Sequence, residues 1–404
     1  MFRGRHRHIC GLGILVALIY GTVLVMQDSQ LLAKVLSARN SLQDPAQEPV
    51  LMGQPELSEI VAPHLPYERP ESPKEAATDS DSSKAQVHRP IGEGTANATF
   101  VILARNSDLE GVLSSMEQVE RRFNKRFGYP WVFLNEVEFE EEFKRRVTEA
   151  TKAPVSFGLI PYDHWFQPDW IDENKARAGR EKMQALGIIY ADSVPYRNMC
   201  RFNSGFFFHH PLLQPYKYYW RVEPGISYTC DIQYDPFDYM RDHNKLYGFT
   251  ITFTEWEATI PTLWKTVKEF ITLHPEYLAE NHAMKYLSDN GGELYNLCHF
   301  WSNFEIADMD FWRGEAYQKF FDFLESKGGF YYERWGDAPV HSIAVALFAS
   351  RDQLHFFDDI GYNHPPFEHC PSGEMRAGRN CDCSAPNSID DRPQSCLSRY
   401  KNLW

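Results

Sequence analysis

The segment "ATFVILARNSDLEGVLSSMEQVERRFNKRFGYPWVFLNE", residues 98–136, contains two apolar runs with an amphipathic stretch between them. Residues 100–103 and 129–136 are short and apolar, as buried β-strands are. Between them, apolar side chains recur at the spacing of one helix face: Leu109, Val112, Leu113, Met116, Val119 and Phe123. Strand, helix and strand within about forty residues predict a βαβ unit, and with it an α/β fold.

The rest of the chain continues this alternation. Further strands are expected in "VSFGLIP" (155–161), "KYYWRVEP" (217–224) and "KLYGFTITFTE" (245–255), and helices after Pro261 and in "EAYQKFFDFLES" (315–326) and "APVHSIAVALFAS" (338–350). We find no internal repeat and no second linker in this region. Residues 98–404 are therefore predicted to form a single large α/β domain.

The N-terminus carries the pattern of a membrane anchor. Basic residues in "MFRGRHRH" precede residues 9–26, which contain no charge and are long enough to cross a bilayer as a helix. The following "LVMQDSQ" is a poor cleavage site for a signal peptide. Because positive charge stays on the cytoplasmic side, we expect a cytoplasmic tail (1–8), a transmembrane signal-anchor (9–26) and a lumenal remainder. This is a type II topology.

Residues 27–97 are expected to form a disordered stem, because much of this segment is rich in Pro, Glu and Ser and has little apolar periodicity. The sequon Asn97-Ala98-Thr99 at its end predicts N-glycosylation in the lumen. The formal net charge of −14, without a basic stripe, argues against nucleic-acid binding.

Seven of the eight cysteines follow the predicted anchor, in a compartment where disulfides persist. Seven is an odd number, so we expect at least one thiol to be free or paired between chains. Four cysteines crowd the tail and could form two bridges there: Cys370, Cys381, Cys383 and Cys396. Their spacing is not a standard zinc pattern.

The common nucleotide-binding and hydrolase signatures GxGxxG, GxxxxGK[ST], HExxH and GxSxG are missing. Attention therefore falls on polar groups in apolar surroundings, of which Glu223 is the first. It lies at the carboxyl end of the strand expected in 217–224, where ligands bind in open α/β sheets. With Arg221 two residues earlier, it could hold a divalent metal that carries a diphosphate. The alternative is a surface Glu that caps a turn.

Glu305 is the second candidate. It lies near the end of "LYNLCHFWSNFEIAD" (294–308) and follows a run of aromatic and amide side chains that suits sugar binding. A desolvated carboxylate in such a place could act as a base or a nucleophile. The alternative is a core segment with one satisfied Glu.

Two further segments offer polar groups. His364, in "FFDDIGYNHPPFEHC" (356–370), could complete a metal site, or it is a lone loop His. "SVPYRNMCRFNSGFFFHHPLL" (193–213) reads as a loop that concentrates donors suited to phosphate, although the same charges could be solvated: Tyr196, Arg197, Arg201 and Ser204. His341 is expected to be a core or interface His on a helix.

Five segments resemble the fungal Golgi α-1,2-mannosyltransferases of glycosyltransferase family 15. They are "YRNMCRFNSGFFFHHPLL" (196–213), "YYWRVEPG" (218–225), "YNLCHFWSNFEI" (295–306), "RWGDAPVHSIA" (334–344) and "DDIGYNHPPFEHCP" (358–371). The resemblance extends from about Thr99 to the C-terminal cysteines, and the segments occur in the family's order. The anchor and stem also agree with the family's layout.

The resemblance implies a GT-A-like fold, with a mixed, mostly parallel sheet flanked by helices. It also implies a GDP-mannose donor, Mn²⁺ and retention of the α-configuration. Glu223 matches the family's Glu-Pro-x metal element and His364 its second ligand. Glu305 matches the proposed catalytic carboxylate, and Tyr196 a tyrosine near the reacting sugar. Donor contacts are expected at Arg105, Asn106, Arg197, Arg201, Ser204 and Arg221. The acceptor would be a mannose-terminated O- or N-linked glycan, extended at a 2-hydroxyl, and the location a Golgi membrane.

Two routes to retention stay open. Glu305 could form a covalent mannosyl-enzyme, or it could only stabilise an oxocarbenium-like state while the leaving phosphate deprotonates the acceptor. Two other function classes also compete. A glycoside hydrolase would place carboxylates among aromatics but would need no metal for a diphosphate. A lumenal carbohydrate-binding protein would bind mannose without turnover.

Overall fold

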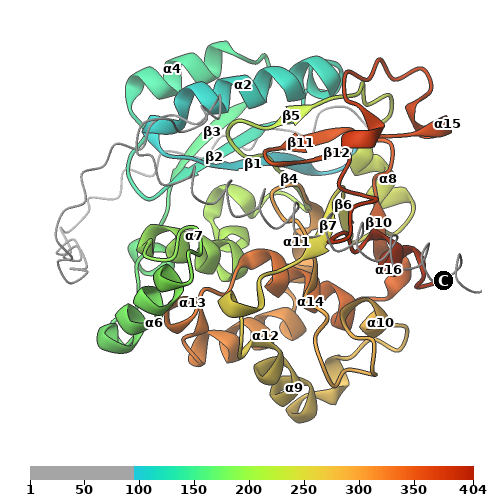
Figure 1. Cartoon of the computed structure of the whole chain (residues 1–404). Coiled ribbons are helices and arrows are strands. Elements are labelled where there is room, and N and C mark those ends of the chain that lie inside the picture. Colours follow the sequence, from blue (N-terminus) through green and yellow to red (C-terminus); the bar gives the residue numbers. More distant parts are fainter. Residues whose placement is uncertain (1–94) are drawn as a thin grey trace, which may run out of the picture. The chain divides into compact units, whose positions relative to one another are not determined.

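A seven-stranded mixed sheet is the centre of residues 95–404, the part of the chain that the computed structural model describes (Figure 1). The strand order is β10-β6-β9-β4-β1-β2-β3. β9 is antiparallel to both of its neighbours, and the other six strands all run in the same direction. The strands are β1 (Ala98–Leu103), β2 (Trp131–Asn135), β3 (Val155–Leu159), β4 (Tyr218–Arg221), β6 (Tyr247–Phe249), β9 (Ile306–Asp308) and β10 (Leu354–Phe356). The predicted α/β class with a mostly parallel sheet is confirmed.

The βαβ unit expected at residues 98–136 is present. β1 and β2 pair in parallel, with Phe100 opposite Trp131, and the rings of these two residues stack 4.4 Å apart. α2 (Leu109–Val119) connects the strands and is followed by a π-helical segment (Glu120–Asn124) and α3 (Lys125–Phe127). The connection ends at Gly128, which adopts the left-handed conformation (φ 70°) that a helix stop requires.

Two cores cover the faces of the sheet, because successive strand residues point to opposite sides. On one face, Phe100 and Ile102 pack beneath α2 and α4 (Glu141–Glu149), and on the other Val101 joins a larger core. Figure 1 shows α2 and α4 on one side and a helical layer on the other. The principal helices of that layer are α6 (Glu173–Ala185), α7 (Val194–Gly205), α9 (Leu263–Leu273), α12 (Glu315–Ser326) and α14 (Asp337–Phe348).

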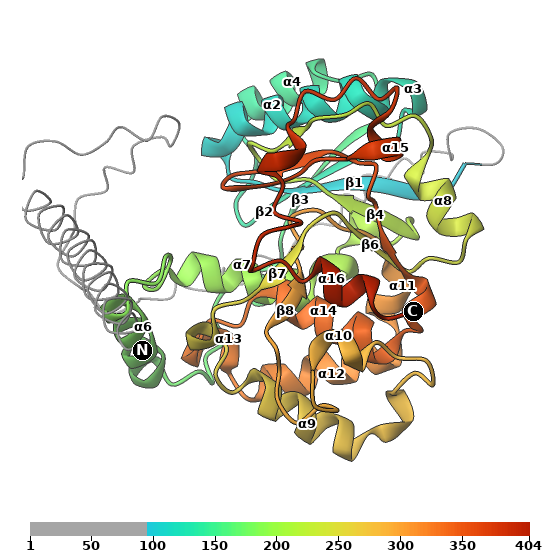
Figure 2. The ribbon, with the colours of Figure 1, turned by 45° about the vertical axis from the view of Figure 1, so that its right-hand side comes forward.

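Shorter helices occupy the connections. They are α5 (Tyr162–Trp165), α8 (Pro236–Asp242), α10 (Met284–Leu287), α11 (Met309–Arg313), α13 (Gly329–Tyr332), α15 (Gly373–Arg376) and α16 (Leu397–Lys401). Figure 2 shows the C-terminal segment, drawn in red, passing from the region of α15 to α16 on the other side of the main sheet. The tail is thus an integral part of the fold.

The single strand predicted at 245–255 is wrong. The chain forms β6 in the main sheet, bends at Thr250 and Ile251, and then forms β7 (Thr252–Thr254), which pairs with β8 (Cys298–Phe300) in a separate two-stranded sheet. The apolar run is continuous because both pieces are largely buried, so the sequence gives no sign that the hydrogen-bonding partner changes.

A small antiparallel sheet brings two distant segments together. β5 (Ser227–Tyr228), soon after β4, pairs with β11 (Tyr362–His364), which pairs in turn with β12 (Phe367–His369). Asn363 lies opposite Ser227, so the next residue of β11 lies beside the turn that follows β4. This register positions the candidate site described below.

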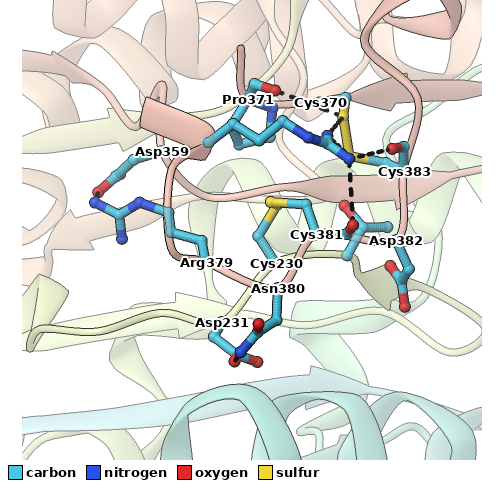
Figure 3. The surroundings of a disulfide bond; sticks show 12 residues. Cys230, Asp231, Asp359, Cys370, Pro371, Arg379, Asn380, Cys381, Asp382 and Cys383 are labelled. Atoms are coloured by element: carbon cyan, nitrogen blue, oxygen red, sulfur yellow. Dashed lines mark hydrogen bonds and ion pairs between the residues drawn. A yellow bond between two sulfur atoms is a disulfide. The ribbon is translucent and has the colours of Figure 1, made fainter. Parts of the chain in front are cut away.

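Three disulfides fix the tail: Cys230–Cys381, Cys298–Cys396 and Cys370–Cys383. The prediction of two bridges among the four tail cysteines is wrong, since only one pair is internal to the tail. The other two bridges join the tail to the rest of the chain: Cys230–Cys381 lies beside β5 (Figure 3), and Cys298–Cys396 joins the tail to β8. Arg122, 5% exposed, strengthens this junction through ion pairs with Asp231 and Asp382. Cys200 is buried and free, as the odd count led us to expect.

Within residues 95–404 no helix is both long and apolar enough to cross a membrane. The expected cytoplasmic tail (1–8), signal-anchor (9–26) and all but the last residues of the stem (27–97) lie outside the described residues. Asn97, at the stem's end, is exposed, and its side-chain amide donates a hydrogen bond to the carbonyl of Pro215 (2.6 Å).

Candidate active site

Glu223 lies at the carboxyl edge of the main sheet, just after β4. The strand's last ladder bond runs from the amide of Val222 to the carbonyl of Val101 (3.0 Å), and the chain then turns. α2 holds this turn, because the Ser115 hydroxyl donates to the Glu223 carbonyl (2.8 Å) and accepts from the Ile226 amide (3.1 Å). An acid therefore ends an apolar strand because it stands where the buried sheet meets its edge.

Two glycines allow this close approach of helix and turn. Gly225 has a φ of +81°, a left-handed conformation that other residues seldom adopt. Its amide donates to the carbonyl of Gly111 in α2 (3.1 Å). A Cβ on Gly111 would lie only 3.1 Å from that of Pro224, so the helix could not come so near with a larger residue.

His364 and Glu223 meet although they are far apart in the sequence. Nε2 of His364 lies 3.4 Å from Oε2 of Glu223, and both side chains keep about a quarter of their surface exposed (27% and 28%). The β5–β11 register accounts for this contact. The ring of Trp301 lies edge-on to His364, with centroids 5.1 Å apart. The two side chains expected to bind a metal are thus in contact, at an accessible edge of the sheet and beside an aromatic ring.

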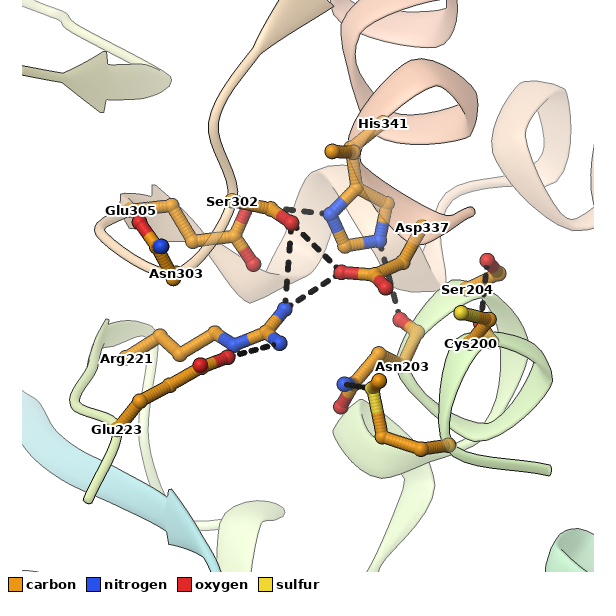
Figure 4. Close-up of polar contacts among 12 residues, drawn as sticks. Cys200, Asn203, Ser204, Arg221, Glu223, Ser302, Asn303, Glu305, Asp337 and His341 are labelled. Carbon is orange, nitrogen blue, oxygen red and sulfur yellow. Dashed lines mark hydrogen bonds and ion pairs between the residues drawn. The ribbon is translucent and has the colours of Figure 1, made fainter. Parts of the chain in front are cut away.

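Arg221 connects Glu223 to a second, buried carboxylate. Its guanidinium contacts Glu223 (2.5 Å) and Asp337 (2.6 Å), and Asp337 also accepts from the Ser302 hydroxyl (2.7 Å) (Figure 4). Burial acts to raise the pKa of Glu223, but the charges and hydrogen bonds of Arg221 and His364 outweigh it and lower this pKa to about 2. Burial likewise acts to lower the pKa of His364, but Glu223 raises it.

Glu305, by contrast, is enclosed, with 1% of its surface exposed. Its Oε1 accepts from the Tyr219 hydroxyl (2.7 Å), while Oε2 lies 3.0 Å from the Tyr247 hydroxyl and 3.1 Å from Nδ1 of His341. Burial, together with the charge of Glu305, raises the pKa of both tyrosines well above the usual value. Both therefore remain hydroxyl donors to the carboxylate.

Tyr196 lies at the start of α7 and is half-buried. Its ring stacks nearly parallel on that of Tyr190, 4.8 Å away, and the Arg334 guanidinium lies 5.3 Å from its centroid. Burial raises the pKa of its hydroxyl well above the usual value. The residue is thus fixed by stacking and is a neutral phenol.

The loop expected around residues 193–213 is instead mostly the buried helix α7, and three predicted donor contacts lie inside it. Arg197, fully buried, donates to the carbonyls of Glu333 and Ser193 (both 3.0 Å). Arg201 pairs with Glu325 (2.7 Å), and the Ser204 hydroxyl donates within the helix. Burial lowers the pKa of Arg197 to about 10. In this arrangement the three side chains bind other groups of the protein and stabilise the packing of α7.

Arg105 and Asn106 lie in a different position, at the end of β1 and hence at the same sheet edge as Glu223. The Arg105 side chain is 56% exposed, 3.8 Å from Glu136. The Asn106 side chain links to the main chain of Glu138 and Glu140. Arg105 is therefore free to contact a ligand at the edge, while Asn106 orders the loop beside it.

Several residues of the site were not singled out from the sequence: Asp337, Ser302, Tyr219 and Tyr247, together with His341, which was expected only as a core His. The spacing of residues in the sequence could have indicated some of them. Tyr219 and Arg221 alternate in one strand and so share a face, and Asp337 and His341 are four residues apart on one helix.

The side chains present fit a hard divalent cation that also binds a ligand. Within residues 95–404 no three His, Cys, Asp or Glu side chains are grouped so as to hold a metal alone. One carboxylate and one imidazole at an open edge would leave the remaining positions for ligand oxygens and water, which is how Mg²⁺-like ions bind nucleotide phosphates.

Comparison with known proteins identifies the fold and the family. Residues 61–403 match the Glycolipid 2-alpha-mannosyltransferase family. The chain is 54% identical over 312 residues to glycolipid 2-alpha-mannosyltransferase 2 of Candida albicans (77% of this chain, 68% of that protein). It is 53% identical over 304 residues to the O-glycoside alpha-1,2-mannosyltransferase omh1 of Schizosaccharomyces pombe (75% and 78%).

Two solved structures are similar. The mannosyltransferase Ktr4p of S. cerevisiae in complex with GDP has a TM-score of 0.74 at 42% identity, covering 79% of this chain and 86% of that one. Core-mannan synthase A of Aspergillus fumigatus, in an Mn/GDP form, has a TM-score of 0.73 at 40% identity, covering 84% and 92%. These matches confirm the expected GT-A-like fold and glycosyltransferase class. The chain belongs to glycosyltransferase family 15, the glycolipid 2-alpha-mannosyltransferases.

Proposed function

We propose that this chain is a retaining α-1,2-mannosyltransferase, which moves mannose from GDP-mannose to the 2-hydroxyl of a mannose on O-linked or N-linked glycans and requires Mn²⁺. The observation that carries the proposal is the contact of Glu223 and His364 at the carboxyl edge of the sheet, 3.4 Å apart. In α/β folds of this kind a nucleotide ligand binds at that edge.

Glu223 and His364 would hold the cation. The Mn/GDP form of the A. fumigatus protein supports manganese as this cation. When bound, the cation supplies Lewis acidity that offsets the charge of the diphosphate leaving group. Arg221 keeps the Glu223 carboxylate in place, and Arg105 is the most accessible of the expected donor contacts.

Glu305 would stabilise positive charge on the reacting sugar. Three hydrogen-bond partners and 1% exposure leave its carboxylate little freedom to approach a sugar carbon. Negative charge in a buried, preorganised position still acts on a developing cation at short range. The enclosure of Glu305 favours attack by the acceptor on the same face over a covalent mannosyl-enzyme.

The acceptor would be a mannose-terminated glycan in the Golgi lumen. The relative named for O-glycoside substrates supports the O-linked acceptor, while the N-linked acceptor rests on the family resemblance. Three disulfides and the exposed Asn97 fit an oxidising, glycosylating compartment. We propose single-pass type II anchoring through residues 9–26, with Asn97 glycosylated and the domain from residue 98 in the lumen.

A transfer assay tests the proposal. The purified full-length chain is given radiolabelled GDP-mannose and α-methyl mannoside, with and without Mn²⁺, and the linkage of the product is determined. We expect a metal-dependent α-1,2-linked product. Free mannose in place of a disaccharide would point to a hydrolase. Mannose binding with no turnover would point to a carbohydrate-binding protein, and either result would overturn the proposal.

A further inference from the structure

The imidazole of His341 lies between two hydrogen-bond acceptors. Its Nε2 is 3.0 Å from the carbonyl oxygen of Asn203, and its Nδ1 is 3.1 Å from Oε2 of Glu305 (Figure 4). A carbonyl cannot donate, and an ionised carboxylate cannot either. A neutral imidazole carries one N–H and could satisfy only one of these partners, whereas an imidazolium satisfies both. Whichever nitrogen carries the N–H of a neutral ring, the other nitrogen still faces an acceptor.

Glu305 is the partner that favours the anion. Besides His341 it receives hydrogen bonds from Tyr219 and Tyr247, and donors around a carboxylate stabilise its charged form. A protonated Glu305 could donate from Oε2 to Nδ1 of His341, but it would lose the negative charge that the two tyrosine hydroxyls stabilise. The proton therefore belongs on His341.

If one of these two groups is charged at this depth, the other must carry the opposite charge. His341 is fully buried and Glu305 is 1% exposed, and an isolated charge at that depth is costly. The other charged and titratable groups near the pair are engaged elsewhere. Arg221, which faces Glu305 from β4, binds Glu223 and Asp337, and the hydroxyl of Tyr317, from α12, donates to the carbonyl of Ser204. Trp312 stacks on the imidazole 4.3 Å away and carries no charge.

We propose that His341 is a positioning residue that carries a permanent proton and forms a neutral, buried ion pair with Glu305. Its catalytic meaning rests on the proposed function, in which Glu305 stabilises the reacting sugar. His341 and Asp337 share one face of α14, so this helix would fix both Glu305 and, through Arg221, the Glu223 edge.

Nitrogen NMR of histidine-labelled protein tests the proton directly, without reference to activity. At pH 7.5, where an exposed imidazole is mostly neutral, we expect both ring nitrogens of His341 to be protonated. Its signal should disappear in His341→Gln and become that of a neutral ring in Glu305→Gln. An unprotonated ring nitrogen on His341 in the unaltered protein would overturn the proposal.

His210 is a matched internal control. It is also buried, at 5% exposure, but its Nδ1 accepts from the Leu212 amide (3.2 Å) while its Nε2 faces the Leu159 carbonyl (3.2 Å). One acceptor and one donor require a single proton, so His210 should be neutral under the same conditions. His210→Gln assigns its signal.

A double-variant cycle gives a second, independent test. His341→Gln strands the Glu305 charge and should lower the thermal midpoint more than Glu305→Gln with His341→Gln does, because the double variant buries no charge. Strictly additive losses would contradict the proposal. If His341→Gln does not fold, the NMR result on the unaltered protein still decides. For transfer, His341→Gln should lower kcat by about tenfold or more with little change in KM for GDP-mannose. If the unaltered protein transfers nothing, the proposed function fails while the NMR and stability results stand.

Discussion

The two carboxylates of the site, Glu223 and Glu305, occupy opposite environments. Glu223 is 28% exposed at the sheet edge, where Arg221 and His364 contact it from the side and leave it open to a ligand. Glu305 is 1% exposed and meets three donors. A metal ligand must exchange partners with water and substrate, whereas a group that acts through its charge is most effective when it is already fixed. This contrast agrees with the different roles that we propose for the two acids.

The largest expected effect comes from removing the enclosed charge. Glu305→Gln keeps the shape of the side chain but not its charge, so we expect transfer to fall by roughly 10³-fold. Binding of GDP with Mn²⁺, followed by calorimetry, should change little, because the Glu305 side chain contacts Tyr219, Tyr247 and His341 and neither of the proposed metal ligands. Undiminished transfer by this variant would remove Glu305 from its role.

The open edge should respond in the reverse way. Glu223→Gln or His364→Ala is expected to weaken Mn²⁺-dependent GDP binding by about 10- to 100-fold, because each takes away one of two protein ligands. Thermal stabilisation by Mn²⁺ and GDP together reports the loss. His243→Ala, at an exposed histidine outside the site, serves as the control. Equal loss in that variant would mean that the effect is not specific to the edge.

Asp337 pairs with Arg221, the residue that contacts Glu223, and its loss should lower the stability of the protein. Asp337→Asn leaves the largely buried Arg221 with one anionic partner, which we expect to lower the free energy of unfolding by about 3 kcal/mol. Urea denaturation measures the change. Glu142→Gln removes an exposed pair with Arg145 and should leave stability nearly unchanged. A neutral outcome for Asp337→Asn would show that Arg221 needs only Glu223.

The smallest effect separates exposed from enclosed arginines. Arg105→Ala should raise KM for GDP-mannose about threefold to tenfold with little change in kcat or in melting temperature, as expected for a solvent-screened contact. Arg201→Ala should instead lower the melting temperature, because its partner Glu325 is left largely buried. If the two variants behave alike, the distinction between the edge and α7 is wrong.

Much of the fold could be predicted from local pattern. The βαβ unit at 98–136 has strands and a helix whose apolar spacings differ plainly, and Glu223 follows from the rule that ligands gather at carboxyl ends of strands. His364 depended on the family resemblance, because only the pairing of β11 with β5 brings it to Glu223, and no local pattern specifies that register.

The failures have a common physical origin in long-range packing. The 193–213 segment reads as a polar loop because its arginines are charged, yet α7 buries them against carbonyl groups that include those of Glu333 and Asp163, from distant parts of the chain. The segment 245–255 forms two strands because its second half, β7, pairs with the distant strand β8 and not with the main sheet. The disulfide partners of Cys381 and Cys396 are similarly distant, so spacing within the tail suggested the wrong pairs.

Anomalous diffraction at the manganese edge, from crystals of this protein grown with Mn²⁺ and GDP, tests the central claim most directly. The account predicts one strong peak within about 2.3 Å of both a Glu223 carboxylate oxygen and Nε2 of His364, in contact with the diphosphate. A peak bound by other side chains, or GDP bound away from this edge, would contradict it.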